Sequence, residues 1–452
     1  MPIEPEPPRP GHIILPGAEP EPAEPPRIVL PPGVARETPA DLPEYPRLRP
    51  LVLVPFSDGQ RELLIVSDPL GVIPGQPVLA VESLAIMQLL DGSLSLNDLT
   101  AALMRESKDL RVANMVRDFV AQLDELLMLE SPRFEHAYQQ LRDDYHRLEI
   151  RPAVHEGRSY PADAAECRRV LDRDFAAAGQ WRDEAHEAVA PADALPRAIM
   201  VPHLDPRRAG AAIARGWLEL GARVPGPLRI VVLGTGHSLM GDAFALTRQH
   251  FETPLGRVAC DTAFVDALAA RLGERAWHGE LAHRDEHAIE FQALYARGRL
   301  GERRDVNIVP VLCGGFHALL DEGRTPREDE DVEALIAAIR DTERAQGGAT
   351  LYVASVDLSH VGPRFGDPAP DERTRAEVES VDREAVEAAR AGDADAWFAA
   401  IAAKDDATRI CGFAATYVML RCAGPAPGRT LRYEVSPEPD KTLVSIAALA
   451  WP

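Results

Sequence analysis

The chain has 452 residues, a hydrophobic fraction of 46% and a formal net charge of -22. This length exceeds what one ordinary hydrophobic core holds, so we expect two ordered domains, and the negative charge disfavours nucleic acid or an anionic membrane as a partner. The sequence lacks an apolar run of roughly 18 residues and does not begin with a signal-peptide pattern, so a cytoplasmic protein is expected.

The first 45 residues repeat proline and glutamate, as in Glu4-Pro-Glu-Pro-Pro8. Such a segment is too polar and too rich in proline to form a core. We therefore predict a disordered tail over residues 1–45.

A small domain is expected over residues 46–135. Apolar runs at 51–56 and 62–66 flank Asp58-Gly59, which is a good signal for a β-hairpin. Helical patterns follow at 84–90, 95–103 and 112–127, and in the last of these the apolar residues recur every three or four positions.

The small domain resembles the winged-helix-like modules related to the PqqD peptide-binding proteins. The resemblance lies in Leu90-Asp-Gly-Ser93 before a short helix and in Leu126-Leu127 at the end of a longer one. Residues 80–131 hold nine acidic and four basic side chains, which disfavours DNA. We expect this module to contact a peptide or a protein, and a purely structural role is the alternative.

The rest of the chain is expected to form a linker helix over 136–150 and an α/β domain over 151–452. Predicted strands alternate there with helices, which is typical of a mainly parallel or mixed sheet between helical layers. The predicted strands are 198–201, 228–233, 306–312, 351–354, 430–435 and 443–449, and the predicted helices are 164–177, 210–220, 263–272, 331–345, 371–390 and 412–421.

Three of these strands end shortly before a histidine. The pairs are 198–201 with His203, 228–233 with His237, and 351–354 with His360. Loops that leave the carboxyl ends of parallel strands converge on one crevice. The pattern therefore predicts one metal or acid/base site, with a structural role for each histidine as the alternative.

Two further segments carry residues suited to chemistry. Cys411 lies at the predicted start of a helix, where the helix dipole favours a thiolate, although a buried, inert thiol is the alternative. Asp357 precedes His360 by three residues and could orient its imidazole for acid/base work, or it could simply cap a turn. Glu286, His287 and Glu290 are expected at the head of a helix.

The run from His283 to His287 also matches His-x-x-Glu-His, the inverted zincin pattern. In that pattern two histidines one helical turn apart bind zinc, and Glu286 would activate water. A zinc metallopeptidase is therefore an alternative function, although it leaves the other histidines and Cys411 without a role.

Eight ordered motifs resemble the Memo family, whose bacterial and archaeal members are labelled AmmeMemoRadiSam system protein B. The resemblance covers about residues 150–452. The motifs are Pro152–Pro161, Val201–His203, Leu233–Ser238, Thr253–Gly256 with Cys260-Asp261, Asp285–Glu290, Ile308–Val311, Ser355–His360 and Ile410–Gly412.

The resemblance implies a fold like that of the class III extradiol dioxygenases. It also implies that His203, His237 and Cys411 are metal ligands, and that Asp357, His360, Glu286 and His287 are catalytic or lie beside the metal. The chain departs from the family at Leu204-Asp205, where Ala-Gly is common, and at Val356, where Ser is often found. These departures could reshape the pocket.

Two imidazoles and a thiolate suit iron, copper or zinc, and we expect iron or copper. Non-haem iron oxygenases use a carboxylate instead of the thiolate, which weakens the case for a dioxygenase. The resemblance implies redox-related chemistry, with a binding or assembly role beside a radical SAM protein and an Ammecr-type protein as the alternative.

Overall fold

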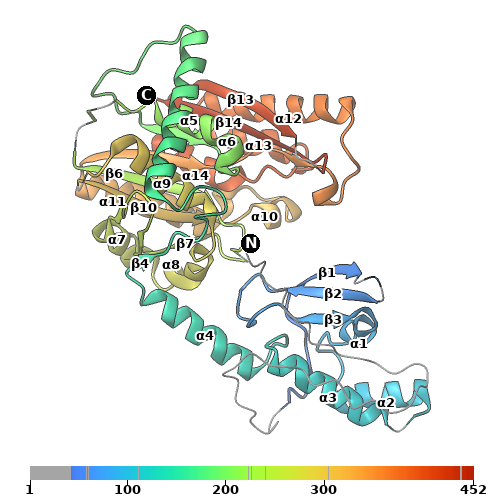
Figure 1. Cartoon of the computed structure of the whole chain (residues 1–452). Helices are drawn as coiled ribbons and strands as arrows, with labels where there is room; N and C mark the ends of the chain where they lie inside the picture. Colours follow the sequence, from blue (N-terminus) through green and yellow to red (C-terminus); the bar gives the residue numbers. More distant parts are fainter. Residues whose placement is uncertain are drawn as a thin grey trace, which may run out of the picture. The chain divides into compact units, whose positions relative to one another are not determined.

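The computed structural model describes residues 42–452 apart from 58, 60, 110, 222, 225, 240, 304, 438 and 439. The disordered tail that we predicted therefore lies almost wholly outside the described residues. The chain divides into two compact units, Met1–Asp144 and Tyr145–Pro452. Each unit is described separately below (Figure 1).

The N-terminal unit has a three-stranded antiparallel sheet in the order β1-β2-β3. The predicted hairpin is present, since β1 (Val52–Ser57) pairs with β2 (Glu62–Ser67), and β3 is Val78–Ala80. The helices are α1 (Leu84–Met87), α2 (Leu96–Ser107) and α3 (Val112–Glu125). The α3 helix buries the predicted stripe of Val116, Phe119, Val120 and Leu123.

The first of these helices is shorter than the predicted stretch 84–90. The carbonyl oxygen of Leu90 accepts a hydrogen bond from the backbone N–H of Leu48, and Gly92 donates to the carbonyl of Pro46. Pairing with this earlier segment turns the chain after Met87 and ends the helix. The next helix begins as predicted, because the Oγ of Ser95 accepts a hydrogen bond from the N–H of Asp98.

The linker helix that we expected over 136–150 overlaps α4, which spans Pro132–His146 and so begins inside the expected small domain. Within the described ranges, none of the helices combines the length and the apolar content needed to span a lipid bilayer.

The C-terminal unit contains a nine-stranded mixed sheet, which confirms the predicted α/β class. Its main order is β12-β14-β5-β11-β6-β10-β7, with β13 beside β14 and β9 beside β10. The strands β5, β11, β6 and β10 run parallel, and β14 pairs antiparallel with β5. The bounds are β5 (Ala198–Val201), β6 (Leu228–Thr235), β7 (Phe244–Leu246), β9 (Ala259–Cys260), β10 (Val306–Cys313), β11 (Ala349–Ser355), β12 (His360–Val361), β13 (Arg429–Pro437) and β14 (Leu443–Trp451). A separate two-stranded pair joins β4 (Ile150–Arg151) to β8 (His250–Phe251).

Helices cover both faces of this sheet (Figure 1). Side chains along β6 alternate between the two cores, with Val231 and Leu233 in one and Ile230 and Val232 in the other. One face packs against α5 (Ala164–Glu184), α6 (Pro206–Trp217) and α9 (His287–Leu300). The other face packs against α7 (Thr262–Leu272), α11 (Glu330–Gln346), α12 (Glu372–Arg390), α13 (Ala394–Ala402) and α14 (Phe413–Ala423). Shorter helices are α8 (Arg275–His278) and α10 (His317–Asp321), and the 3-10 helices are η1 (Val81–Ser83), η2 (Glu280–His283), η3 (Pro326–Glu328) and η4 (Pro363–Phe365).

The α6 helix begins at Pro206, earlier than the predicted start at Gly210. Asp205 caps it by accepting the N–H of Arg207, and Pro206 lies in the first turn, where its missing N–H costs nothing. The helix therefore starts three residues after His203. This short connection keeps His203 close to the carboxyl end of β5.

Candidate metal centre

The predicted crevice lies at the carboxyl ends of three neighbouring parallel strands. His203 follows β5 by two residues, His237 follows β6 by two residues, and β11 lies between these strands and ends at Ser355. The first turn of α9, which begins at His287, packs directly against Gly234 of β6. A Cβ atom on Gly234 would lie only 3.0 Å from Ala288 and Ile289. A glycine on β6 thus allows the head of α9 to approach.

Three imidazoles meet at this point. The potential ligand atoms of His203, His237 and His287 all lie within 4.8 Å of one another. The ring centroid of His203 lies 5.0 Å from the ring centroid of each of the other two histidines. The rings of His237 and His287 stack with their centroids 4.8 Å apart. His203 is buried, His287 is partly buried and His237 is the most exposed. The cluster therefore runs from the interior to the surface.

Each imidazole in the cluster has a fixed acceptor beside its Nδ1 atom. The Nδ1 of His203 lies 2.8 Å from the carbonyl oxygen of Ser355. Glu286 serves the other two, with Oε1 at 3.0 Å from the Nδ1 of His237 and 3.1 Å from that of His287. A carbonyl or carboxylate oxygen only accepts, so a neutral imidazole beside it carries its proton on Nδ1 and presents Nε2 as the atom with the lone pair. The three Nε2 atoms are thus available as metal ligands.

The surroundings of the cluster shift the pKa values of its groups in opposite directions. Burial, and then the charges of His287 and His237, hold the pKa of His203 well below its usual value. Burial also lowers the pKa of His237, but the hydrogen bond and the charge of Glu286 outweigh it, so the net pKa is raised. Burial raises the pKa of Glu286, and the two imidazoles more than reverse this, leaving it well below its usual value. Glu286 is therefore a carboxylate near neutral pH.

Cys411 lies against His203. Its Sγ is 3.3 Å from the Nε2 of His203, and it accepts a hydrogen bond from the N–H of Asp357 at 3.2 Å. A side chain on Gly412 would meet Val356 and the carbonyl of Asp357 within 3.0 Å, so glycine at this position lets the Cys411 loop pack closely.

The thiolate that we expected at Cys411 is not favoured in this structure. Cys411 precedes α14, but burial and then the charge of Asp357 raise the pKa of its thiol well above the usual value. The thiol is therefore neutral near pH 7 unless a cation lies beside it.

Asp357 and His360 have different partners from those expected. The Oδ1 of Asp357 accepts the backbone N–H groups of His203 and Leu204 at 3.0 and 3.1 Å. The Nδ1 of His360 instead lies 2.8 Å from the carbonyl of Leu358, and its ring meets Phe365 at 5.3 Å. Asp357 thus fixes the backbone at His203, because the loop after β5 presents two N–H groups to it. Burial raises the pKa of Asp357.

Sequence reasoning did not assign a role to His155, although it lies in the Pro152–Pro161 motif. Its ring lies 5.8 Å from that of His287 and 5.6 Å from Phe291. A buried ion pair places this segment, since Arg151 binds Glu290, and Glu290 accepts the N–H of His155 at 2.9 Å. The Tyr160 hydroxyl also donates to Glu290. The motif could have indicated His155 as part of the crevice.

The inverted zincin motif does not have the geometry that it needs. His283 ends the 3-10 helix η2, whereas His287 begins α9 and Glu286 is the N-cap of that helix. The buried Nε2 of His283 donates to the carbonyl of Ala245 at 3.1 Å. The two histidines therefore do not lie one turn apart on a single helix, and the zinc peptidase alternative loses its basis.

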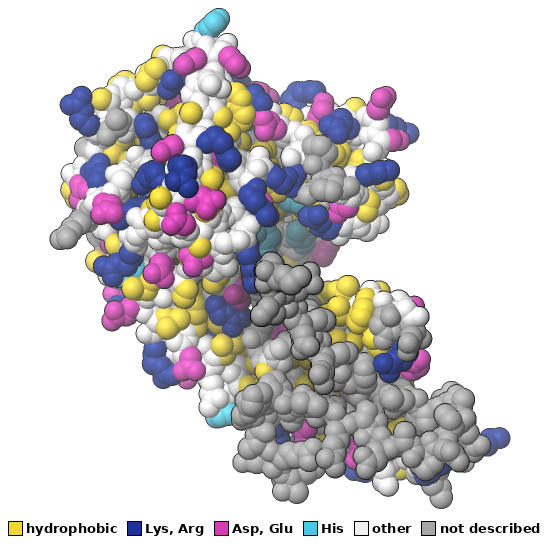
Figure 2. Space-filling model, in the orientation of Figure 1, with side chains coloured by type: hydrophobic (Ala, Val, Ile, Leu, Met, Phe, Trp, Pro, Cys, Tyr) yellow, Lys and Arg dark blue, Asp and Glu magenta, His cyan; other side chains and the backbone are white. Residues whose placement is uncertain are grey.

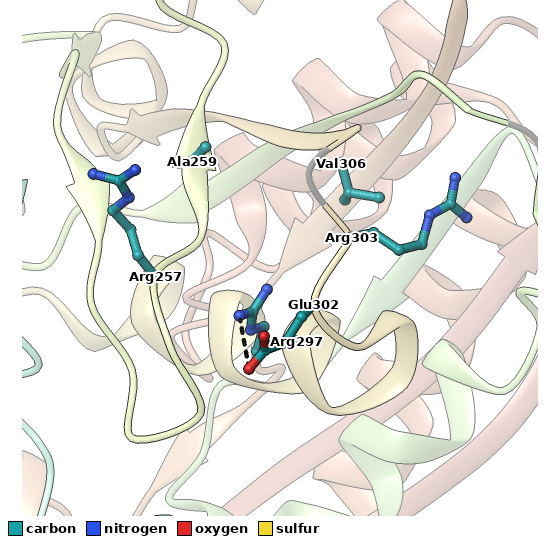
Figure 3. Close-up of a pocket in the computed structure, with 6 residues that line it drawn as sticks. All are labelled: Arg257, Ala259, Arg297, Glu302, Arg303 and Val306. Atoms are coloured by element: carbon teal, nitrogen blue, oxygen red, sulfur yellow. Dashed lines mark ion pairs between the residues drawn. The ribbon is translucent and has the colours of Figure 1, made fainter.

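A separate cavity of about 560 Å³ is lined by Arg257, Arg297, Glu302, Arg303 and other residues (Figure 3). Two of its arginines have structural partners. Arg297 donates to the carbonyls of Leu255 and Gly301, and Arg303 donates to Asp305. Figure 3 shows Arg303 extending away from Arg297.

The histidine cluster lies elsewhere on the C-terminal unit. Figure 2 shows histidines gathered in a hollow of this unit, with Lys and Arg side chains around it.

Comparisons with known proteins identify the family to which the chain is similar. The family described as Memo-like protein matches residues 151–450. A MEMO1 family protein of Aquifex aeolicus is 26% identical over 412 residues, which cover 90% of this chain and 99% of the relative. A MEMO1 family protein of Thermus thermophilus is 32% identical over 267 residues, which cover 58% of this chain and 70% of that protein. The Aquifex match is longer than the family match and extends into the N-terminal unit.

Proposed function

This chain belongs to the Memo family, and on that premise we propose that it binds one transition-metal ion at the histidine crevice. His203 and His237 supply Nε2 atoms, and the Sγ of Cys411 is the third ligand. His287 is the competing third ligand, since its Nε2 belongs to the same cluster. The metal is iron or copper, with zinc as the third candidate.

One observation carries this proposal. All three imidazoles have Nδ1 beside a fixed oxygen acceptor, so Nε2 is the ligand atom of each ring in its neutral form. Histidines that bind metals in proteins characteristically donate the other ring N–H to a carboxylate or a backbone carbonyl. The crevice therefore has both the ligand atoms and the groups that orient them.

The donor atoms also fit the metals named. Imidazole nitrogen suits zinc, copper and iron, and sulfur tilts the site away from magnesium and calcium. The high pKa of the Cys411 thiol does not exclude it, because a bound cation deprotonates a coordinating thiol. The Oδ2 of Asp357 lies 3.8 Å from the Nε2 of His203, so a carboxylate oxygen is also within reach of the site.

The bound metal would supply redox or Lewis-acid chemistry to an unknown substrate. The chain's own residues would then orient groups and move protons. Glu286 holds His237 and His287 in register, and Asp357 fixes the loop that carries His203. His360 has its Nδ1 on the carbonyl of Leu358, which leaves Nε2 for acid/base work.

Anaerobic purification followed by metal analysis tests the proposal, because oxidation of Cys411 would destroy a ligand. We expect about one iron or copper per wild-type chain and a large loss in His237→Ala. His278→Ala is the matched control, since this histidine is half exposed and lies outside the cluster. Unchanged metal content in a folded His237→Ala protein would overturn the proposal.

A second candidate function is a binding role in a modification system with a radical SAM protein and an Ammecr-type protein. The feature that favours it is strand β1, which pairs with β2 at the edge of its sheet and exposes Val52 and Val54. An edge strand can accept a peptide as an additional strand. Capture of a peptide by the wild-type chain, weakened in Val54→Glu and retained in His237→Ala, would support this role, whereas capture that Val54→Glu leaves unchanged would contradict it.

A further inference from the structure

We propose that Gln292 is a positioning residue, whose single amide group holds the His203 and His287 segments in register for metal binding. This inference rests on the proposed function, because it concerns the same ligands. The side chain of Gln292 lies on α9 and is fully buried.

Gln292 contacts both neighbouring segments through one nitrogen atom. Its Nε2 donates to the carbonyl oxygen of Pro202, immediately before His203, at 2.9 Å. The same Nε2 donates to the Oγ of Ser355 at 2.9 Å. Both amide protons are therefore used, one on the loop after β5 and one at the end of β11.

Ser355 extends this network to both histidines. Its Oγ donates to the carbonyl of Ala288, the residue after His287, at 2.6 Å. Its own carbonyl oxygen accepts the Nδ1 proton of His203 at 2.8 Å. A displacement of Gln292 would thus reach the backbone at His203 and the head of α9 together.

The amide orientation of Gln292 is fixed from the opposite side. The Nε1 of Trp217 lies 3.0 Å from the Oε1 of Gln292, and an indole nitrogen can only donate. Oxygen must therefore face Trp217, and nitrogen must face Pro202 and Ser355. Pro202, Ser355 and Trp217 are all buried. An apolar residue at position 292 would therefore leave the polar groups that these three partners present to Gln292 without a hydrogen bond.

The test measures Co²⁺ affinity and the visible absorption of bound Co²⁺, which depends on the arrangement of the ligands. The variants are Gln292→Leu, which removes the whole amide, and Ser355→Ala, which removes only the hydroxyl. Gln249→Leu is the matched control, since Gln249 is also buried and donates to a backbone carbonyl, that of Tyr145, outside the cluster. Melting temperatures are recorded for all proteins without metal.

We expect Gln292→Leu to bind Co²⁺ about 10- to 100-fold more weakly, the range typical of groups that orient metal ligands, with a shifted absorption band. Gln249→Leu should lower the melting temperature and leave affinity and spectrum unchanged. Should Gln292→Leu fail to fold, Ser355→Ala decides the question with the same two readouts. Wild-type affinity and an unshifted band in both site variants would overturn the inference alone. Where Co²⁺ does not bind the wild-type chain, Cu²⁺ is titrated in its place, and absence of binding by both ions would overturn the proposed function and this inference with it.

Discussion

The Sγ of Cys411 lies 3.3 Å from the Nε2 of His203, although the two residues are 208 positions apart in the chain. The contact joins the loop before α14 to the loop after β5. It places a sulfur atom beside the imidazole nitrogen that has no proton.

From this contact we predict that Cys411, rather than His287, completes the metal site. The Cu²⁺ complex of the wild type should show a thiolate-to-copper absorption band. Cys411→Ser should lose that band and bind copper more weakly, whereas His287→Ala should keep it. A wild-type spectrum without the band, together with loss of copper in His287→Ala, would make the three histidines the ligand set.

Glu286 is predicted to set metal affinity without binding the metal. Replacing it by glutamine leaves only one oxygen to face His237, His287 and the N–H groups of His237 and Ala288. We expect Glu286→Gln to weaken metal binding by about 10- to 100-fold in titration calorimetry. Glu280→Gln is the control, because Glu280 is equally buried and also pairs with a histidine, His146, outside the site. Equal loss in both variants would contradict the prediction.

The stability of the C-terminal unit should fall in acid partly through His283. Burial lowers the pKa of His283 to about 4, and among the residues that the structure describes its Nδ1 has no hydrogen-bond partner. A depressed pKa in the folded state means that neutral His283 contributes stability above the unfolded pKa of 6.5. This contribution is lost as the pH falls from about 6.5 to about 4, because the unfolded chain takes up a proton that the folded chain refuses.

At roughly 1.4 kcal/mol per pKa unit, the loss reaches about 3 kcal/mol. Urea denaturation across this pH range should show a smaller decline in His283→Leu than in the wild type. His278→Ala should decline like the wild type, since His278 is exposed. An identical pH profile for His283→Leu and the wild type would be evidence against this role.

The buried pair of Arg151 and Glu290 is predicted to be a major support of the segment that carries His155. Both side chains are fully buried, and the Nη1 of Arg151 lies 2.5 Å from the Oε2 of Glu290. Glu290→Gln leaves an uncompensated guanidinium in the interior and should destabilise the protein by about 3–5 kcal/mol in urea denaturation. Glu302→Gln, whose side chain is 83% exposed and pairs with Arg297 at 3.6 Å, should cost about 1 kcal/mol or less. Equal effects of the two variants would refute this prediction.

Local sequence pattern was enough to predict most elements of the fold. The strand Ala198–Val201 has the predicted bounds, and the helices near 263–272 and 371–390 differ from prediction by one residue at their starts. Periodic apolar residues and capping residues act over a few positions, so they can be identified in the sequence. The α13 helix and β7 were missed, because short elements are stabilised mainly by the core that they join.

The sequence by itself determined the family, the α/β class and the strand-end positions of His203 and His237, because strand pattern and motif order are local properties. Only the tertiary structure decided how these residues are paired. It brought His287 into the imidazole cluster, assigned Asp357 to the backbone of His203 rather than to His360, and separated His283 from the site. Hydrogen bonding and burial depend on which loops meet at the sheet edge, and contacts across 50 to 200 residues are set by the packing of the whole unit.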